Sequence, residues 1–184
     1  MTFHRFVNVG IIATTLCIPA LAFGAFYISA PGNTCQPAFG NTTVDQDDFG
    51  VGNQSTSATN SYICPMPYSG NSYGYDNVAD AHVYMFDASS TSEFRCYPFV
   101  NTPSGSQYWG NTRWACSTAG GCADTTTTFT GLTNISWNSS MLPYYIQIYG
   151  YEEDWNFGFR CDLPPATSTS WSGRSWIISY DWED

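Results

Sequence analysis

The sequence predicts an all-β protein: a single antiparallel β-sandwich, of jelly-roll or immunoglobulin-like type, stabilised by disulfides. From residue 25 onward the chain holds three leucines but 29 aromatic residues. Aromatic and β-branched side chains lose rotamer freedom on helices and fit the pleated surface of a sheet. Short stretches of alternating character also lie between clusters of Gly, Pro, Ser and Asn, which is typical of many short strands. We therefore expect a core filled with aromatic rings.

The 184-residue chain is long enough for one domain with one core. Residues 1–24 are typical of a signal peptide: a weakly basic start, an apolar middle, and Ala22 and Gly24 at the −3 and −1 positions. The apolar run is too short to span a membrane, which favours cleavage over anchoring. Residues 25–60 are expected to form an N-terminal arm or loops, and residues 61–184 the sandwich.

Nine stretches have the alternation or the β-rich composition expected of strands. The last of them is uncharged from residue 175 to 180 and could form an exposed sheet edge that pairs with a second chain. The expected strands are 62–65, 78–86, 94–100, 113–116, 125–130, 134–137, 144–149, 157–163 and 176–182.

The charge balance excludes two classes of partner. The formal net charge is −10, and it becomes −11 once Arg5 leaves with the leader. The chain has no lysine. Nucleic acids and anionic membrane surfaces bind clustered cations, so neither is an expected partner.

A short repeat predicts one disulfide. Tyr84 precedes Cys96 by twelve residues, Tyr149 precedes Cys161 by the same distance, and both cysteines follow Phe-Arg. We interpret each copy as a strand, a loop and a strand, that is, one hairpin used twice. Cys96 and Cys161 would then occupy equivalent positions, which makes their pairing the simplest one.

The remaining cysteines predict two further bonds, since an even number of cysteines in an exported chain implies disulfides. Cys116 and Cys122 flank a flexible stretch and are expected to close a small ring. By elimination Cys35 joins Cys64, with Cys35 to Cys96 as the alternative. Removal of the leader leaves six cysteines: Cys35, Cys64, Cys96, Cys116, Cys122 and Cys161.

Three motifs carry a resemblance to known sequences. They are Cys64-Pro65 after the first expected strand, a tyrosine-valine strand that ends at Asp87, and the late sequence 161–164, Cys-Asp-Leu-Pro. With them, residues 62–164 resemble a loose set of short exported bacterial proteins of unknown function. The resemblance implies an exported β-protein and brings no activity and no catalytic residues.

Few residues could support catalysis. His82 is the one histidine beyond the leader and lies within an expected strand, which disfavours a Ser-His-Asp triad, a Cys-His nucleophile and a zinc site. A glycosidase needs two facing carboxylates. The candidates are Glu93 with either Glu152 or Glu153, all in expected loops.

Two groups of residues are candidates for binding. Asp45, Asp47 and Asp48 concentrate carboxylates before a glycine, which indicates either a calcium site or a solvated acidic loop. Seven aromatic residues lie in or beside segments rich in Gly, Ser and Asn, where flat rings could stack on sugars, although a chain so poor in leucine must bury most of its rings. They are Tyr68, Tyr108 and Trp171, together with four main candidates. These candidate rings are Tyr73, Tyr75, Trp109 and Trp155.

The sequence therefore predicts a non-enzymatic surface or interaction protein of unknown ligand. We expect it to be secreted, or located in the periplasm or at the cell surface, with a glycan or another surface protein as its partner. One alternative is a lectin-like carbohydrate-binding module that uses loop aromatics, with or without calcium. A second alternative is a small glycoside hydrolase that depends on carboxylates.

Overall fold

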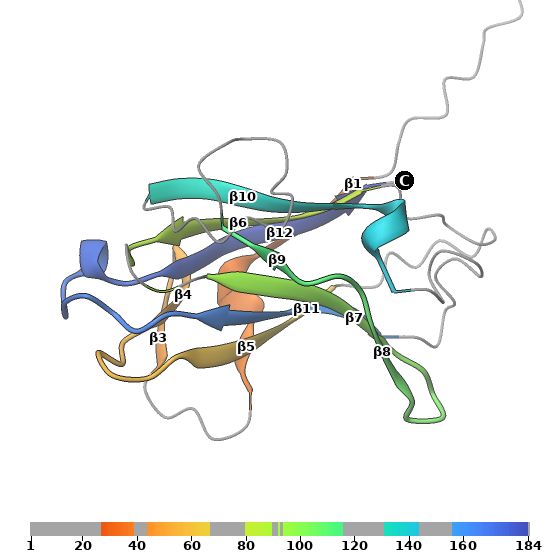
Figure 1. Cartoon of the computed structure of the whole chain (residues 1–184), viewed down its shortest axis with the longest axis horizontal. Helices are drawn as coiled ribbons and strands as arrows, with labels where there is room; N and C mark the ends of the chain where they lie inside the picture. Colours follow the sequence, from red (N-terminus) through yellow and green to blue (C-terminus); the bar gives the residue numbers. More distant parts are fainter. Residues whose placement is uncertain are drawn as a thin grey trace, which may run out of the picture.

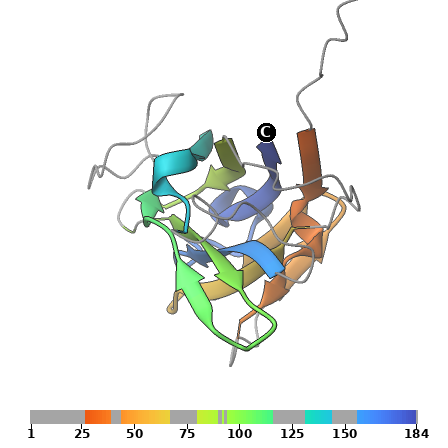
Figure 2. The same ribbon diagram turned by 90° about the vertical axis from the view of Figure 1, so that its right-hand side faces the viewer.

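The structure is a computed structural model that describes residues 27–38, 44–66, 80–89, 92, 94–115, 131–143 and 156–183. Within these residues the chain forms β-strands and short 3-10 helices, and the strands make two antiparallel sheets that lie face to face (Figures 1 and 2). The prediction of an all-β sandwich is confirmed. No helix in the described part of the chain is long and apolar enough to cross a membrane.

We call the two six-stranded sheets sheet A and sheet B. Sheet A has the order β10-β6-β12-β4-β3, and β1 also pairs with β12. Its strands are β1 (Tyr27–Pro31), β3 (Val44–Asp47), β4 (Gly50–Asn53), β6 (Asp80–Asp87), β10 (Gly131–Asn138) and β12 (Trp176–Glu183).

Sheet B has the order β2-β5-β11-β7-β8, and β9 also pairs with β7. The 3-10 helices η1 (Gly32–Thr34), η2 (Ser139–Met141) and η3 (Trp171–Gly173) lie between strands. The strands of sheet B are β2 (Gln36–Pro37), β5 (Asn60–Pro65), β7 (Arg95–Asn101), β8 (Gln107–Trp109), β9 (Arg113–Trp114) and β11 (Asn156–Leu163).

Strand β12 lies in the interior of sheet A, so the expectation of an exposed edge at residues 175–180 is wrong. It pairs with β6 on one side and with β4 and β1 on the other. Tyr180, for example, lies between Val83 of β6 and Ala30 of β1. Edge strands use charged residues to prevent pairing with another chain, and a strand that is paired on both sides does not need them. The uncharged sequence of β12 is therefore that of a central strand.

Residues 27–60, expected as an arm or loops, contribute strands β1 to β4 to the two sheets. The glycines that made this segment resemble a loop allow close packing instead. A Cβ atom on Gly32 would lie 2.0 Å from the carbonyl oxygen of Ile177, and one on Gly50 would lie 1.9 Å from it. Only glycine lets the backbone approach β12 so closely.

The interpretation of residues 84–96 as a hairpin is also wrong. Strand β6 belongs to sheet A and β7 to sheet B, so the connection between them crosses from one sheet to the other. The second copy of the repeat begins at Tyr149, outside the described residues. The equal spacing of tyrosine and cysteine in the two copies did not imply that β6 pairs with β7. Strand β6 pairs with β10 and β12 instead.

Aromatic rings fill the space between the sheets, as expected. Phe159 of β11 lies 5.2 Å from Trp137 of β10 and 6.0 Å from Tyr180 of β12, measured between ring centres. Phe157 stacks on Trp182 at 5.1 Å. Each of these contacts joins sheet B to sheet A, so the rings themselves hold the two layers together.

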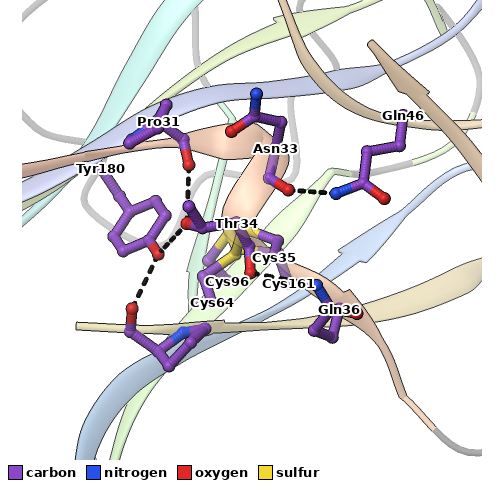
Figure 3. The surroundings of a disulfide bond; sticks show 11 residues. Pro31, Asn33, Thr34, Cys35, Gln36, Gln46, Cys64, Cys96, Cys161 and Tyr180 are labelled. Atoms are coloured by element: carbon purple, nitrogen blue, oxygen red, sulfur yellow. Dashed lines mark hydrogen bonds between the residues drawn. A yellow bond between two sulfur atoms is a disulfide. The ribbon is translucent and has the colours of Figure 1, made fainter. Parts of the chain in front are cut away.

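Two buried tyrosines add hydrogen bonds between the sheets. Tyr62 of β5 donates to the carbonyl oxygen of Gly52 at 2.8 Å, and burial raises its pKa to about 12, which keeps the hydroxyl neutral. Tyr180 of β12 donates to the carbonyl oxygen of Pro65 at 2.7 Å and lies 2.6 Å from the hydroxyl of Thr34 (Figure 3). Each sheet therefore sends one phenol to the backbone of the other.

The two disulfides between described cysteines are Cys35–Cys64 and Cys96–Cys161, which confirms both predicted pairings. Cys96 and Cys161 lie directly opposite each other on the neighbouring strands β7 and β11. All four cysteines belong to the buried core, and Figure 3 shows the two bonds beside Thr34. The predicted pair Cys116 and Cys122 lies outside the described residues.

The two disulfides differ in the length of chain that they close. The separation is 65 residues for Cys96–Cys161 and 29 for Cys35–Cys64. We expect the C96A/C161A double variant to lose about 4 kcal/mol of unfolding free energy and C35A/C64A about 3.5 kcal/mol, because longer loops cost more entropy to close. Urea unfolding under non-reducing conditions measures both values. A smaller loss for C96A/C161A would contradict this ordering.

Asp87 is a buried carboxyl group at the end of β6. Its Oδ1 accepts hydrogen bonds from the Ser89 amide at 3.0 Å and the Ser175 hydroxyl at 2.8 Å. Among the described residues its Oδ2 has no hydrogen-bond partner. Burial raises the pKa of Asp87 from 3.8 to about 6, because the charged form is poorly solvated there.

This shift predicts how stability depends on pH. Between about pH 4 and pH 6 the folded chain keeps a proton on Asp87 that the unfolded chain has lost, so unfolding free energy falls as pH rises through that window. Asp87→Asn removes this titration. We expect the unfolding free energy of the variant to lack the fall of roughly 3 kcal/mol that Asp87 causes across the window in the unmodified protein. Urea unfolding of both proteins across this pH range measures the effect, and an unchanged slope in the variant would disprove it.

Candidate functional site

The outer side of sheet B brings charged and aromatic side chains together on three neighbouring strands. Side chains of a strand alternate between the two sides of a sheet. Cys96 and Cys161 point into the core, so their neighbours Arg95, Tyr97 and Arg160 point outward. Arg160 lies opposite Tyr97 in the pairing of β11 with β7.

One carboxylate on this side binds two guanidinium groups. Asp162 Oδ2 accepts from Arg95 Nε at 2.8 Å, and Asp162 Oδ1 lies 3.8 Å from Arg160 Nε. The Ser61 hydroxyl donates to Asp162, and Arg160 Nη2 donates to the Ser61 oxygen at 3.3 Å. The Asp162 side chain is only 6% exposed, whereas Arg95 is 51% and Arg160 38% exposed. The buried carboxylate thus positions two accessible cations.

Aromatic rings continue this surface toward β8. The Trp109 ring lies 5.0 Å from Tyr97 and 5.5 Å from Phe99, and meets Tyr97 edge-on. The Arg160 guanidinium carbon lies 5.7 Å from the centre of the Tyr97 ring, a cation–π arrangement. Trp109 is 43% exposed although it rests on these neighbours. Tyr97 and Phe99 therefore support one side of the Trp109 ring, and the rest of the ring faces solvent.

Tyr97 remains an uncharged phenol at neutral pH. Burial raises its pKa, and the negative charge of Asp162 raises it further, while the two arginines act in the opposite direction. We call this surface the arginine–aromatic face. It consists of Ser61, Arg95, Tyr97, Trp109, Arg160 and Asp162.

Of the four candidate rings, the described residues include Trp109, which the structure exposes as expected. Tyr73, Tyr75 and Trp155 lie outside the described residues. Sequence reasoning missed Tyr97 and both arginines of the face. The alternation around the cysteine in Arg95-Cys96-Tyr97 was the available signal, because an inward disulfide cysteine forces both neighbours outward.

A second group of exposed rings lies over the outer side of sheet A. Phe49 is 60% and Trp171 is 40% exposed. Trp171 stacks on Trp176 with ring centres 5.8 Å apart and lies 5.2 Å from Phe86, while Phe49 meets it edge-on at 5.5 Å. Trp176 is only 1% exposed beneath this layer, so Trp171 covers an apolar part of the sheet.

The acidic turn between β3 and β4 uses its carboxylates locally. Asp47 Oδ1 accepts from the backbone amides of Phe49 at 2.7 Å and Gly50 at 3.2 Å. Asp45 forms an ion pair with Arg174, and Asp48 is exposed. Across the described ranges, no three His, Cys, Asp or Glu side chains are grouped as a metal ion would need.

The structure places His82 in a hydrogen bond with a buried carboxyl group within sheet A. Its Nδ1 lies 2.8 Å from Oδ1 of Asp181, which is 1% exposed. Ser136 lies opposite His82 in the pairing of β10 with β6. The candidate hydrolase residues Glu93, Glu152 and Glu153 lie outside the described residues.

Comparison with known proteins yields one structural similarity. No family model matches the sequence, and no curated protein matches it. A solved structure described as xylan-binding module CBM15 is similar to this chain, with a TM-score of 0.43 and 15% sequence identity. The similarity covers 87% of this chain and 97% of the other. A TM-score and a sequence identity this low say nothing about the function of this chain. Its own side chains must indicate the function.

The central role of Asp162 can be tested through stability. We expect Asp162→Asn to lower the unfolding free energy by about 2 kcal/mol at low salt, because Arg95 and Arg160 lose their shared partner and repel each other. High salt screens that repulsion, so the loss should shrink there. Urea unfolding at low and high salt measures both effects. Equal losses under the two conditions would contradict the electrostatic explanation.

Proposed function

We propose that this protein is an exported, non-enzymatic binding protein that recognises glycans through the arginine–aromatic face. The observation that carries the proposal is Trp109, a ring that is 43% exposed yet fixed in place by Tyr97 and Phe99. A preformed ring binds a ligand with little loss of conformational entropy.

The groups around Trp109 match the chemistry of a sugar. A pyranose presents an apolar face of C–H groups, which stacks on an aromatic ring, and a rim of hydroxyls, which needs donors and acceptors. The guanidinium groups of Arg95 and Arg160 supply donors, and the Tyr97 phenol can donate or accept. Because these side chains lie across the outer surface of a sheet, an extended polymer can lie along them.

The proposed location outside the cell rests on two features. The core contains the disulfides Cys35–Cys64 and Cys96–Cys161, which persist in oxidising compartments. Residues 1–24 have the pattern of a signal peptide. Both are expected of a protein that meets glycans outside the cytoplasm.

Affinity electrophoresis against a panel of soluble polysaccharides tests this function. We expect retardation by at least one of them, and about tenfold weaker binding for Trp109→Ala, since 1.4 kcal/mol corresponds to a factor of ten. Trp109→Phe should retain most of the affinity because it keeps a ring at the same place. Trp171→Ala is the matched control, as Trp171 is similarly exposed but lies over sheet A.

Two results would overturn the proposal. One is the absence of retardation by any polysaccharide of the panel. The other is unchanged binding in a folded Trp109→Ala variant. Thermal unfolding of each variant establishes that it is folded.

A further inference from the structure

The two sheets carry opposite charge although the chain as a whole is acidic. The described strands of sheet B hold three arginines and one aspartate, a formal charge of +2. The described strands of sheet A hold six acids and no arginine or lysine. The acids of sheet A are Asp45, Asp47, Asp80, Asp87, Asp181 and Glu183.

The excess positive charge of sheet B reaches its outer surface. Arg113 is 7% exposed and lies opposite the inward-facing Cys96, so it does not contribute to that surface. Arg95 and Arg160 face outward and share the single carboxylate of Asp162. One negative charge against two positive charges leaves a net charge of +1 on the arginine–aromatic face.

Both guanidinium groups retain unused donors. An arginine has five N–H donors. Within the described residues, the hydrogen bonds of Arg95 use its Nε toward Asp162, and those of Arg160 use its Nη2 toward Ser61. Arg160 Nε is buried and faces Asp162. Since 51% and 38% of the Arg95 and Arg160 side chains are exposed, the terminal nitrogens of the two guanidinium groups supply the donors for a ligand from solvent.

The cations and the rings form one continuous row. The Arg160 guanidinium lies over Tyr97, and Tyr97 contacts Trp109. The row crosses from β11 through β7 to β8, a distance of about 10 Å at the usual strand spacing. A ligand that covers this row meets a positive charge at one end and an exposed ring at the other.

We propose that the glycan bound by this face is acidic, a polysaccharide that carries the carboxylates of uronic acids. This inference rests on the proposed function and adds the class of ligand. A guanidinium group matches the geometry of a carboxylate and can bind it through two parallel hydrogen bonds. Trp109 stacks on a sugar ring of the same polymer, so the two ends of the row bind different parts of one ligand.

The net charge of the chain does not oppose this binding at close range. At physiological salt, charges more than about 8 Å apart are largely screened. The acidic strands belong to the other sheet of the sandwich. Among the charged groups of the described residues, those nearest to a bound carboxylate are therefore the two arginines and their common aspartate.

Binding to an acidic polysaccharide and to its neutral counterpart tests this inference. The probes are polygalacturonate and glucuronoxylan, each compared by affinity electrophoresis with the same polymer after chemical reduction of its carboxyl groups. We expect at least one acidic form to bind about tenfold more tightly than its reduced form. Arg95→Gln and Arg160→Gln should each lower affinity for that acidic form several-fold, and should lower affinity for the reduced form by a clearly smaller factor, because only the acidic form loses a charge-assisted bond to a carboxylate.

Leu132→Glu is the control for net charge. It changes the charge of the chain by the same amount, at a position in sheet A that is 70% exposed, and we expect it to leave the preference for acidic polymer unchanged. Equal binding of acidic and reduced polymers would overturn the inference while leaving the proposed function intact. Binding of neutral polysaccharides alone would do the same, whereas no binding of any polysaccharide would overturn the proposed function itself.

Discussion

The register between β7 and β11 is the constraint on which the rest of sheet B depends. The disulfide between Cys96 and Cys161 joins two residues that lie directly opposite each other and point into the core. Because side chains alternate along a strand, a shift of one residue would move every side chain to the other surface. The same bond that stabilises the core therefore keeps Arg95, Tyr97 and Arg160 together on the outer surface.

The core and the candidate site rely on the same kind of residue for different reasons. Between the sheets, Phe159 and Tyr180 bury their rings and replace the aliphatic core that a chain poor in leucine cannot build. On the outer side of sheet B, Trp109 rests on Tyr97 and remains exposed. Composition alone cannot separate these roles, since burial depends on which surface of a sheet a ring occupies.

The sequence predicted the fold class and two disulfides, but it did not predict which strands pair with each other. The all-β class and the two disulfides came from composition and from cysteine number and spacing. The repeat that suggested Cys96–Cys161 was nevertheless misinterpreted, because β6 and β7 lie in different sheets. Likewise Trp109 was recognised as a candidate because it lies beside a segment rich in Gly, Ser and Asn. Arg95 and Arg160 were not recognised, because nothing in their local sequence shows that they share Asp162.

By itself the sequence determined the class of the protein: a sheet structure filled with aromatic rings, closed by disulfides and strongly acidic. Those properties depend on which residue types the chain contains and do not depend on the order in which its strands pair. Only the tertiary structure decided that sheet B is cationic within an acidic chain, and that β12 is a central strand. The physical reason is that residues far apart in the chain become neighbours through strand pairing, which no local pattern of residues records.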